Sequence, residues 1–281
     1  MYARPRTIEE AVAAMAAGDA LAMAGGTDVF PSHVGRPIAR PVVDLSRVEG
    51  LRGISQANGV VRIGGATTWT DIAEASLPPA FDGLKAAARE VGSIQIQNRG
   101  TIAGNLCNAS PAADGIPPLL ALDAVVEVRS VRGTRSLPLP DFVTGYRATA
   151  LQPGEIVTAV IVPAPSPRAR SAFVKLGARR YLVISILMAA AVIERDHQGT
   201  IVRAAIAVGS ASPVARRLGD LEAALIGLKA GTLPSTVIAE SHLAPLSPID
   251  DVRATAAYRL DAARTVIGEV LDRAGGVSAL G

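Results

Sequence analysis

One stretch of the chain, residues 99–114, combines the residue types that bind a polar ligand. Its glycines allow a close approach to the backbone, and its short hydroxyl and amide side chains place hydrogen-bond donors and acceptors beside that backbone. The residues that carry this chemistry are Gly100, Thr101, Gly104, Asn105, Asn108, Ser110 and Asp114. Because almost no bulky side chain interrupts them, the stretch is suited to lie against a ligand. A turn-rich loop that caps its own backbone is the alternative interpretation.

A second glycine pair, Gly25-Gly26, follows the apolar segment 20–24, which predicts a strand, and precedes renewed apolar residues at Val29 and Phe30. Two adjacent glycines let successive backbone N–H groups converge on one anion, so the pair suits a diphosphate. A plain turn is the commoner use of such a pair. The chain contains neither Gly-x-Gly-x-x-Gly nor a Walker sequence, which disfavours Rossmann and P-loop folds.

Composition excludes several classes of function. The 281 residues suffice for two or three modest domains, and 28 basic against 25 acidic residues, interspersed, give no support to nucleic-acid binding. The single cysteine excludes an internal disulfide and an iron–sulfur cluster held by this chain alone, and it favours a cytosolic compartment. No signal-peptide pattern opens the chain, and the longest apolar run, 181–193, is shorter than the ~20 residues of a bilayer span, so we expect no membrane insertion.

Several isolated residues have two interpretations. The three histidines lie far apart without a second ligand at metal spacing, so we expect no metal site. Cys107 has no nearby histidine and is interpreted as a packed small side chain rather than a nucleophile. Lys175 lies between apolar neighbours and either faces solvent or contacts a ligand. Asp114 either contacts a ligand or caps the short helix that follows it, and Tyr181 lies either at a sheet rim or against a cofactor.

The elements that position these residues follow from apolar periodicity and turn residues. Predicted helices cover 7–17, 69–75, 81–91, 117–122, 219–228 and 250–273. Predicted strands cover 20–24, 41–45, 51–56, 60–63, 124–129, 155–162, 171–176, 184–194 and 201–208. Asn58-Gly59 predicts a hairpin turn, and the proline-rich segment 163–167 is the best candidate for a linker.

Five motifs in this order resemble the FAD-binding subunit of molybdenum hydroxylases, the flavoprotein of the xanthine dehydrogenase and carbon monoxide dehydrogenase family. They are Ala24–Asp28, Thr101–Asn105 continued by Ala109–Asp114, Phe142-x-x-Gly-Tyr-Arg147, Pro153-Gly-Glu-Ile156 and Lys175-Leu-Gly-x-Arg-Arg180. The resemblance covers essentially the whole chain. One departure is Ala103, which stands where many relatives have glycine.

The resemblance implies an α+β fold. A PCMH-type FAD-binding region over 1–165, made of two α+β lobes of about 1–55 and 56–165, is expected to precede a C-terminal domain over 170–281. That second domain is expected to consist of a small antiparallel sheet and helices. The independent prediction of a break at 163–167 agrees with this boundary.

The resemblance also implies the cofactor-binding residues. The first loop would bind the FAD diphosphate with backbone N–H groups, Thr101–Asn105 would do the same from the other lobe, and the remaining residues would contact the ribityl chain and the isoalloxazine ring. The implied residues are Met23, Ala24, Gly25, Gly26, Thr27, Asp28, Val29, Thr101, Ile102, Ala103, Gly104, Asn105, Asn108, Asp114, Val157 and Lys175. No catalytic side chain is expected, because the flavin performs the redox chemistry.

By the same resemblance, the chain is expected to be the FAD-carrying electron-transfer subunit of a cytoplasmic oxidoreductase. It would accept electrons from the [2Fe-2S] clusters of a small subunit and pass them to NAD, oxygen or another acceptor. A molybdopterin-binding large subunit would complete the assembly, a dimer of heterotrimers. Two alternatives remain open: a non-redox scaffold subunit of the same complex, and a stand-alone flavin oxidase of the PCMH fold.

Overall fold

A computed structural model describes residues 1–180 and 182–276, and Tyr181 therefore lies outside the described residues. The chain forms two compact units, each assembled from separate segments. The first unit comprises Met1–Ala75, Ile94–Ala109 and Ala124–Ala164, and the second comprises Ser76–Ser93, Ser110–Asp123 and the chain from Pro165 onward. The proposed domain boundary between 165 and 170 stays a prediction.

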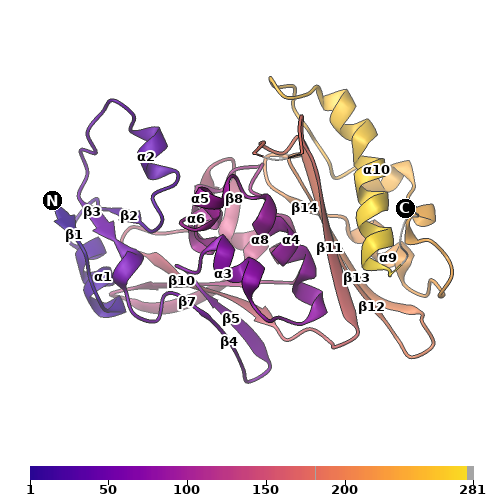
Figure 1. The fold of residues 1–281 in the computed structure, drawn as a ribbon, viewed down its shortest axis with the longest axis horizontal. Helices are drawn as coiled ribbons and strands as arrows, with labels where there is room; N and C mark the ends of the chain where they lie inside the picture. The colour runs from indigo at the N-terminus through magenta and orange to yellow at the C-terminus, as the bar shows by residue number, and fades with distance from the viewer. Residues whose placement is uncertain (181, 277–281) are drawn as a thin grey trace. The chain divides into compact units, whose positions relative to one another are not determined.

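A three-stranded parallel sheet begins the first unit, in the order β1-β3-β2 (Figure 1). Its strands are β1 (Tyr2–Ala3), β2 (Leu21–Met23) and β3 (Val42–Asp44). Helix α1 (Ile8–Ala16) packs on the sheet through buried Ala11, Val12 and Met15. Thr7 caps this helix in a complete capping box with Glu10, as its sequence spacing predicts.

A five-stranded antiparallel sheet forms the rest of the core of the first unit, in the order β4-β5-β10-β6-β7. Its strands are β4 (Ile54–Ala57), β5 (Val60–Gly64), β6 (Val125–Ser130), β7 (Gly133–Pro138) and β10 (Ile156–Pro163). Asn58 and Gly59 both have positive φ, so the predicted hairpin turn is confirmed. Strand β7 was not predicted. It is an edge strand with mostly exposed side chains, so it lacks an apolar face and tolerates a terminal proline.

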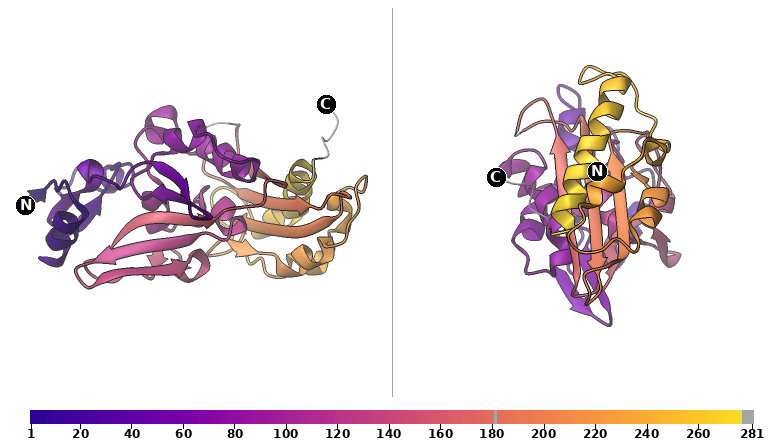
Figure 2. Two further views of the ribbon diagram at one scale, coloured as in Figure 1. Left: turned by 90° about the horizontal axis from the view of Figure 1, so that it is seen from below. Right: turned by 90° about the vertical axis from the view of Figure 1, so that its right-hand side faces the viewer.

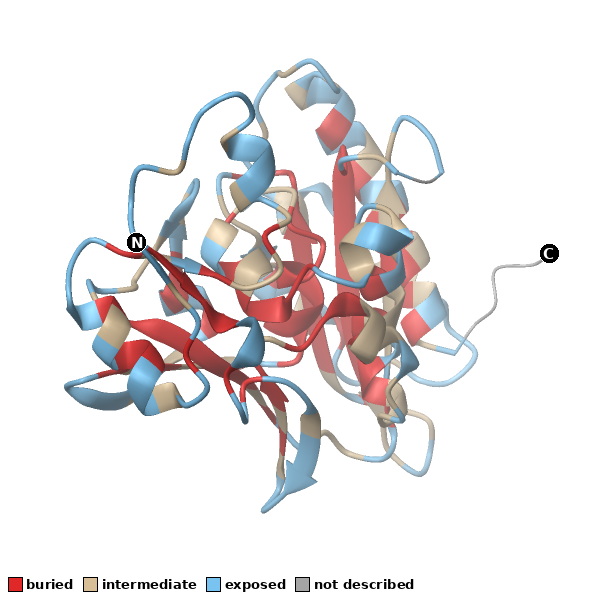
Figure 3. Cartoon of the chain, turned by 60° about the vertical axis from the view of Figure 1, so that its left-hand side comes forward, coloured by how far each residue is buried: buried red, intermediate tan, exposed pale blue. Residues whose placement is uncertain are grey.

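Short elements complete the first unit. They are α2 (Val29–Ser32), the 3-10 turn η1 (Leu45–Arg47), α3 (Trp69–Glu74), α5 (Ile94–Gln97), α6 (Ile102–Asn108), α8 (Leu139–Phe142), β8 (Val143–Gly145) and β9 (Ala148–Thr149). Strands β3 and β10 are largely buried, whereas the segment that carries α2 is largely exposed (Figure 3). The stretch interpreted as a loop is in part a helix, α6, because the Thr101 hydroxyl accepts a hydrogen bond from the Gly104 N–H and starts it.

The second unit is built on a four-stranded antiparallel sheet, in the order β11-β12-β13-β14. Its strands are β11 (Ala169–Leu176), β12 (Leu187–Arg195), β13 (Ile201–Gly209) and β14 (Arg216–Arg217). Helix α10 (Ala256–Ala274) crosses one face (Figure 2), and α4 (Asp82–Glu90) and α7 (Ile116–Ala121) pack on the strands as well. The unit also contains η2 (Pro79–Phe81), α9 (Gly219–Leu225), η3 (Pro234–Val237) and η4 (Glu240–Leu243).

Strand β12 explains the longest apolar run of the sequence. Every residue from Leu187 to Ile193 is buried, because helices cover both faces of the strand. Ala189 and Ala191 belong to the cluster that contains α10, whereas Ala190 and Val192 face α4 and α7. A run without alternation is the pattern expected of such a doubly covered strand. No helix in the described part of the chain combines the length and the apolar character that a membrane crossing needs.

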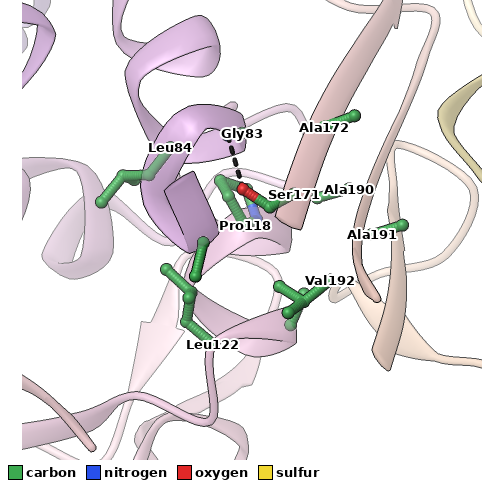
Figure 4. A pocket seen from close by; sticks show the side chains of 11 residues that line it. Gly83, Leu84, Pro118, Leu122, Ser171, Ala172, Ala190, Ala191 and Val192 are labelled. Atoms are coloured by element: carbon green, nitrogen blue, oxygen red, sulfur yellow. Dashed lines mark hydrogen bonds between the residues drawn. The ribbon is translucent and has the colours of Figure 1, made fainter. Parts of the chain in front are cut away.

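Helix α4 packs on β11 at a glycine. The Gly83 N–H donates a hydrogen bond of 2.8 Å to the Ser171 hydroxyl, and the surrounding side chains are mostly small (Figure 4). A Cβ on Gly83 would lie 2.8 Å from the Ala172 carbonyl oxygen, which belongs to a sheet and cannot swing aside. A residue without a side chain is therefore needed here.

We expect Gly83→Ala to destabilise the protein by about 1–3 kcal/mol through this overpacking. Helix propensity alone would predict the opposite sign, a gain of up to about 1 kcal/mol. Gly219→Ala is the matched control, since Gly219 also lies in the first turn of a helix and an added Cβ there would have nothing within 4 Å. Urea unfolding of the three proteins measures the effect. A Gly83→Ala protein as stable as Gly219→Ala would contradict the close approach.

Candidate functional site

The first glycine loop connects β2 to α2. Met23 ends β2 and pairs with Asp44 of β3, and Gly26 has a φ of +75°, which favours glycine. Within the described residues, the backbone N–H groups of Gly25, Gly26, Thr27 and Asp28 donate to no protein acceptor. Gly26 is nevertheless a buried residue. Consecutive unpaired N–H groups on a partly buried loop are the feature expected of an anion-binding concavity, and a binding role for 23–29 stays a prediction.

The two glycine loops lie against each other within the first unit. A Cβ on Gly25 would lie only 1.7 Å from the Arg99 carbonyl oxygen, and one on Gly100 would lie 3.5 Å from the Thr27 hydroxyl. Gly25 is therefore required by the contact between the loops. The structure brings together two segments that are more than seventy residues apart in the sequence.

The second glycine segment, residues 99–105, is anchored by its own backbone N–H groups. Ile102 and Ala103 donate to the carbonyls of Thr67 and Gly65, at 3.0 and 3.2 Å. The Gly104 N–H donates to Thr101, and so does that of Asn105. These four donors are already used, so residues 102–105 present side chains rather than N–H groups. A binding role for 101–105 stays a prediction.

The two asparagine side chains of α6 differ in their hydrogen bonding. Asn105 Oδ1 is buried and has no hydrogen-bond partner within the described residues. A buried acceptor without a partner costs free energy, so it marks a place where a ligand donor or a water fits. Asn108 Oδ1 accepts a hydrogen bond of 2.8 Å from Arg147 Nη1. The NH₂ group of Asn108 is therefore the part of this side chain that could donate to a ligand.

Val157 lies beside the start of α6. It belongs to β10, next to an irregularity in the pairing with β6, and a Cβ on Gly65 would lie 2.5 Å from its carbonyl oxygen. The same Cβ would lie 3.3 Å from the Cβ of Ala103. Gly65 was missed in the sequence, where it follows Gly64 as an ordinary strand end. The close approach of Gly65 to the Val157 carbonyl is visible only once β5 and β10 are paired.

Asp114 and Lys175 belong to the second unit, where they form a buried ion pair. Lys175 Nζ lies 2.7 Å from Asp114 Oδ2, and the two side chains are 6% and 8% exposed. Burial raises the pKa of the Asp114 carboxyl, and the Lys175 ammonium opposes that rise. The interpretation of Lys175 as a solvent-facing strand residue is wrong. Asp114 as a helix cap is also wrong, because α7 has Gly115 at its N-cap and no side-chain cap.

Both members of the pair keep some capacity for a ligand. Lys175 Nζ uses one N–H for Asp114 and one for the Glu90 carbonyl, at 3.1 Å, and its third N–H has no partner in the described part of the chain. Asp114 Oδ1 accepts from the Ser185 hydroxyl at 2.5 Å, and each carboxylate oxygen retains one lone pair. The pair can therefore offer one donor and one acceptor side by side.

Neither a reactive thiol nor a metal site is found among the described residues. Cys107 is an exposed residue, yet the protein atoms crowded around its thiol raise the pKa to about 12, so it is not a thiolate at neutral pH. Among the described residues, no group of three His, Cys, Asp or Glu side chains could hold a metal ion.

Comparison with known families identifies the chain. Residues 1–165 match the FAD binding domain in molybdopterin dehydrogenase, and residues 172–274 match the CO dehydrogenase flavoprotein C-terminal domain. The chain belongs to the FAD-binding subunits of the molybdenum hydroxylases. The unpaired N–H groups of the first loop and the unpartnered Asn105 oxygen fit a cofactor with a diphosphate and polar ring edges.

Individual relatives of this FAD-binding subunit match over nearly their full length. The xanthine dehydrogenase FAD-binding subunit of Escherichia coli O157:H7 is 34% identical, over 98% of this chain and 97% of that protein. The carbon monoxide dehydrogenase medium chain of Hydrogenophaga pseudoflava is 29% identical, over 97% and 96%. Reconstituted CO dehydrogenase from Oligotropha carboxidovorans superposes with a TM-score of 0.90 at 27% identity, over 99% of this chain and 98% of that chain. The expected α+β fold is confirmed.

One family motif of the FAD-binding subunit serves the fold. Glu155, in Pro153-Gly-Glu-Ile156, forms a two-pronged ion pair with Arg135 of β7, at 2.8 and 2.7 Å, and accepts from the Gln152 N–H at 2.8 Å. Arg135 holds the pKa of the Glu155 carboxyl below its ordinary value. The motif thus attaches the edge strand β7 to the start of β10.

We expect Asp114→Ala to lower the unfolding free energy of the cofactor-free chain by about 3 kcal/mol, because it leaves the Lys175 ammonium buried and unpaired. Lys175→Met should cost a similar amount, and the double variant should recover most of the loss. Asp19→Ala, which breaks the exposed pair with Arg40, is the control and should cost less than about 1 kcal/mol. Denaturant unfolding measures all four variants. Additive losses in the double variant would show that the two side chains do not depend on each other.

Proposed function

We propose that this chain carries FAD and transfers electrons through it. It accepts electrons from the [2Fe-2S] clusters of a partner subunit and passes them to NAD, oxygen or another acceptor. The observation that carries the proposal is the first glycine loop, whose four consecutive N–H groups, Gly25 to Asp28, have no acceptor in the described protein. A diphosphate supplies acceptors for such groups.

The partners follow from the relatives. A xanthine dehydrogenase FAD-binding subunit and carbon monoxide dehydrogenase medium chains, by their names, are parts of larger enzymes. We infer that this chain likewise assembles in the cytoplasm with a molybdopterin-binding large subunit and a [2Fe-2S] small subunit, as a dimer of heterotrimers. Its one cysteine cannot bind a cluster, so the clusters must come from another chain.

The chain's own residues bind and orient the cofactor. The loop Met23–Val29 holds the diphosphate with N–H groups, and Asn105 and Asn108 contribute an acceptor and a donor. Asp114 and Lys175 add a lone pair and an N–H from one place, which suits the pyrimidine edge of a flavin, where donors and acceptors alternate. When bound, FAD supplies the redox chemistry.

We expect the purified chain to bind FAD and turn yellow, and Gly25→Ala to weaken FAD binding about thirtyfold or more, equivalent to about 2 kcal/mol. The added methyl pushes the first loop away from Arg99 and separates its N–H groups. Gly26 is a poorer test site, because its positive φ would strain any other residue whether or not the loop binds a ligand.

Gly18→Ala is the control, since nothing lies within 4 Å of the added Cβ. FAD titration of the cofactor-free proteins, followed by flavin fluorescence, measures the three affinities. A wild-type chain that binds no FAD would favour the scaffold alternative. Equal affinities for Gly25→Ala and Gly18→Ala would show that the loop is only a turn.

Co-expression with candidate partner chains tests the electron-transfer role. We expect a complex that contains molybdopterin and iron–sulfur chains, in which the substrate of the large subunit bleaches the visible absorbance of the flavin. Omitting the iron–sulfur chain should abolish this bleaching. Flavin reduction that does not need the iron–sulfur chain would contradict the proposed route and favour a stand-alone oxidase.

A further inference from the structure

A buried polar network in the second unit extends from Asp114 into the C-terminal part of the chain. The Ser185 hydroxyl donates to Asp114 Oδ1 at 2.5 Å. The Ser210 hydroxyl donates to the Ser185 carbonyl at 3.2 Å, and the Ser210 N–H donates to the Pro111 carbonyl at 2.9 Å. The segment that ends in Asp114 is therefore held by residues that lie more than seventy positions later.

Arg259 of α10 completes this network. It is a buried residue, 3% exposed. Its Nη1 donates to the carbonyls of Ile186 and Ser210, at 2.6 and 2.9 Å, and its Nη2 donates to Asp251 Oδ1 at 2.7 Å. The guanidinium thus holds the backbone next to Ser185, at Ile186, and the backbone of Ser210, the two segments that the Ser210 hydroxyl joins.

The network is costly in free energy. Burying a guanidinium requires removing it from water, and Arg259 Nε has no partner within the described residues. A buried ion pair of this kind is weak evidence for stability, because apolar side chains of similar volume often stabilise a core as well. The burial of Arg259 and its hydrogen-bonded partners is better explained if they orient another group.

The group to be oriented is the Asp114 carboxylate. Lys175 holds only Oδ2, and a carboxylate held at one oxygen can rotate about the broad χ2 torsion of aspartate. A second donor on Oδ1 prevents that rotation and fixes the direction of both remaining lone pairs. Ser185 supplies this donor, and its hydroxyl can do so only while the backbone at 185–186 stays in place.

We propose that Ser185 is a positioning residue for Asp114 and that Arg259 acts through Ser185, so that the carboxylate presents one fixed orientation to the flavin. The inference rests on the proposed FAD binding. Neither Ser185 nor Arg259 needs to touch the cofactor. The loss of either should therefore alter FAD affinity and flavin redox potential through the same intermediate, the direction of Asp114.

The experiment compares Ser185→Ala with Ser212→Ala in the full chain. Ser212 is a buried serine of the same unit whose hydroxyl, among the described residues, bonds only to the backbone of Ala211 and Ser247. It therefore matches Ser185 in size and burial but not in the contact with Asp114. FAD dissociation constants and the flavin midpoint potential are measured for both, with melting temperatures of the FAD-free proteins.

We expect Ser185→Ala to raise the FAD dissociation constant about tenfold and to shift the midpoint potential, because it removes a hydrogen bond to a charged group. Ser212→Ala should change the dissociation constant by no more than about twofold and leave the midpoint potential unchanged. Arg259→Lys, which keeps the charge but not the fork of donors, should weaken FAD in the same direction. In the double variant with Ser185→Ala, the two effects should not add.

Each contrary outcome has a distinct meaning. If Ser185→Ala and Ser212→Ala bind FAD equally and share one midpoint potential, the network is purely structural and the inference is overturned. Additive effects of Arg259→Lys and Ser185→Ala would overturn the claim that Arg259 acts through Ser185. A wild-type chain that binds no FAD would overturn the proposed function, and this inference with it.

Discussion

The first unit depends on one close contact, the approach of Gly25 to the carbonyl of Arg99, which leaves no room for a side chain. The partner segment cannot yield, because the Gly100 N–H donates to the Ile96 carbonyl and the Gly100 carbonyl accepts from the N–H of Trp69. Trp69 is itself completely buried. The position of the first loop is therefore set by the core, through a chain of backbone contacts that contains no flexible side chain.

This rigidity matters because the loop has N–H dipoles and no positive charge of its own. Residues 23–29 contain no lysine or arginine, so the loop itself offers an anion N–H dipoles and no positive side chain. Such groups bind well when they already converge before the ligand arrives, since ordering a mobile loop would consume part of the binding free energy. The packing of Gly25 on Arg99 restricts the loop before any ligand arrives. A glycine that looks like a flexible residue in the sequence is thus a rigid one in the fold.

The sequence predicts local features of this molecule better than distant ones. The capping box at Thr7 and the turn at Asn58-Gly59 depend on residues within four positions, and both are present. Helix α6 was interpreted as part of a loop because glycine and asparagine are poor helix formers, and its anchors, the carbonyls of Gly65 and Thr67, come from another segment.

In the candidate site too, the sequence predicts local features better than contacts between distant residues. Its residue types were visible in the sequence, and the family resemblance supplied their expected roles. Which hydrogen-bonding groups are free was not visible, because that depends on the partners each group finds in the fold. The N–H groups of Ile102 and Ala103 have protein acceptors, whereas those of Gly25 to Asp28 have none in the part of the chain that the structure describes. Lys175 and Asp114 are 61 positions apart, and no local pattern links them.

The two units use different physical solutions for holding polar groups. The first keeps neutral N–H groups unpaired, which costs little while water can reach them. The second buries the charges of Asp114 and Lys175, which is tolerable only if nearly every polar atom finds a partner. Ser185 and the Glu90 carbonyl provide those partners, and they leave one N–H of Lys175 and one lone pair on each oxygen of Asp114. Because apolar side chains would stabilise the unit as well, the charges are better explained by a ligand that uses the groups left over.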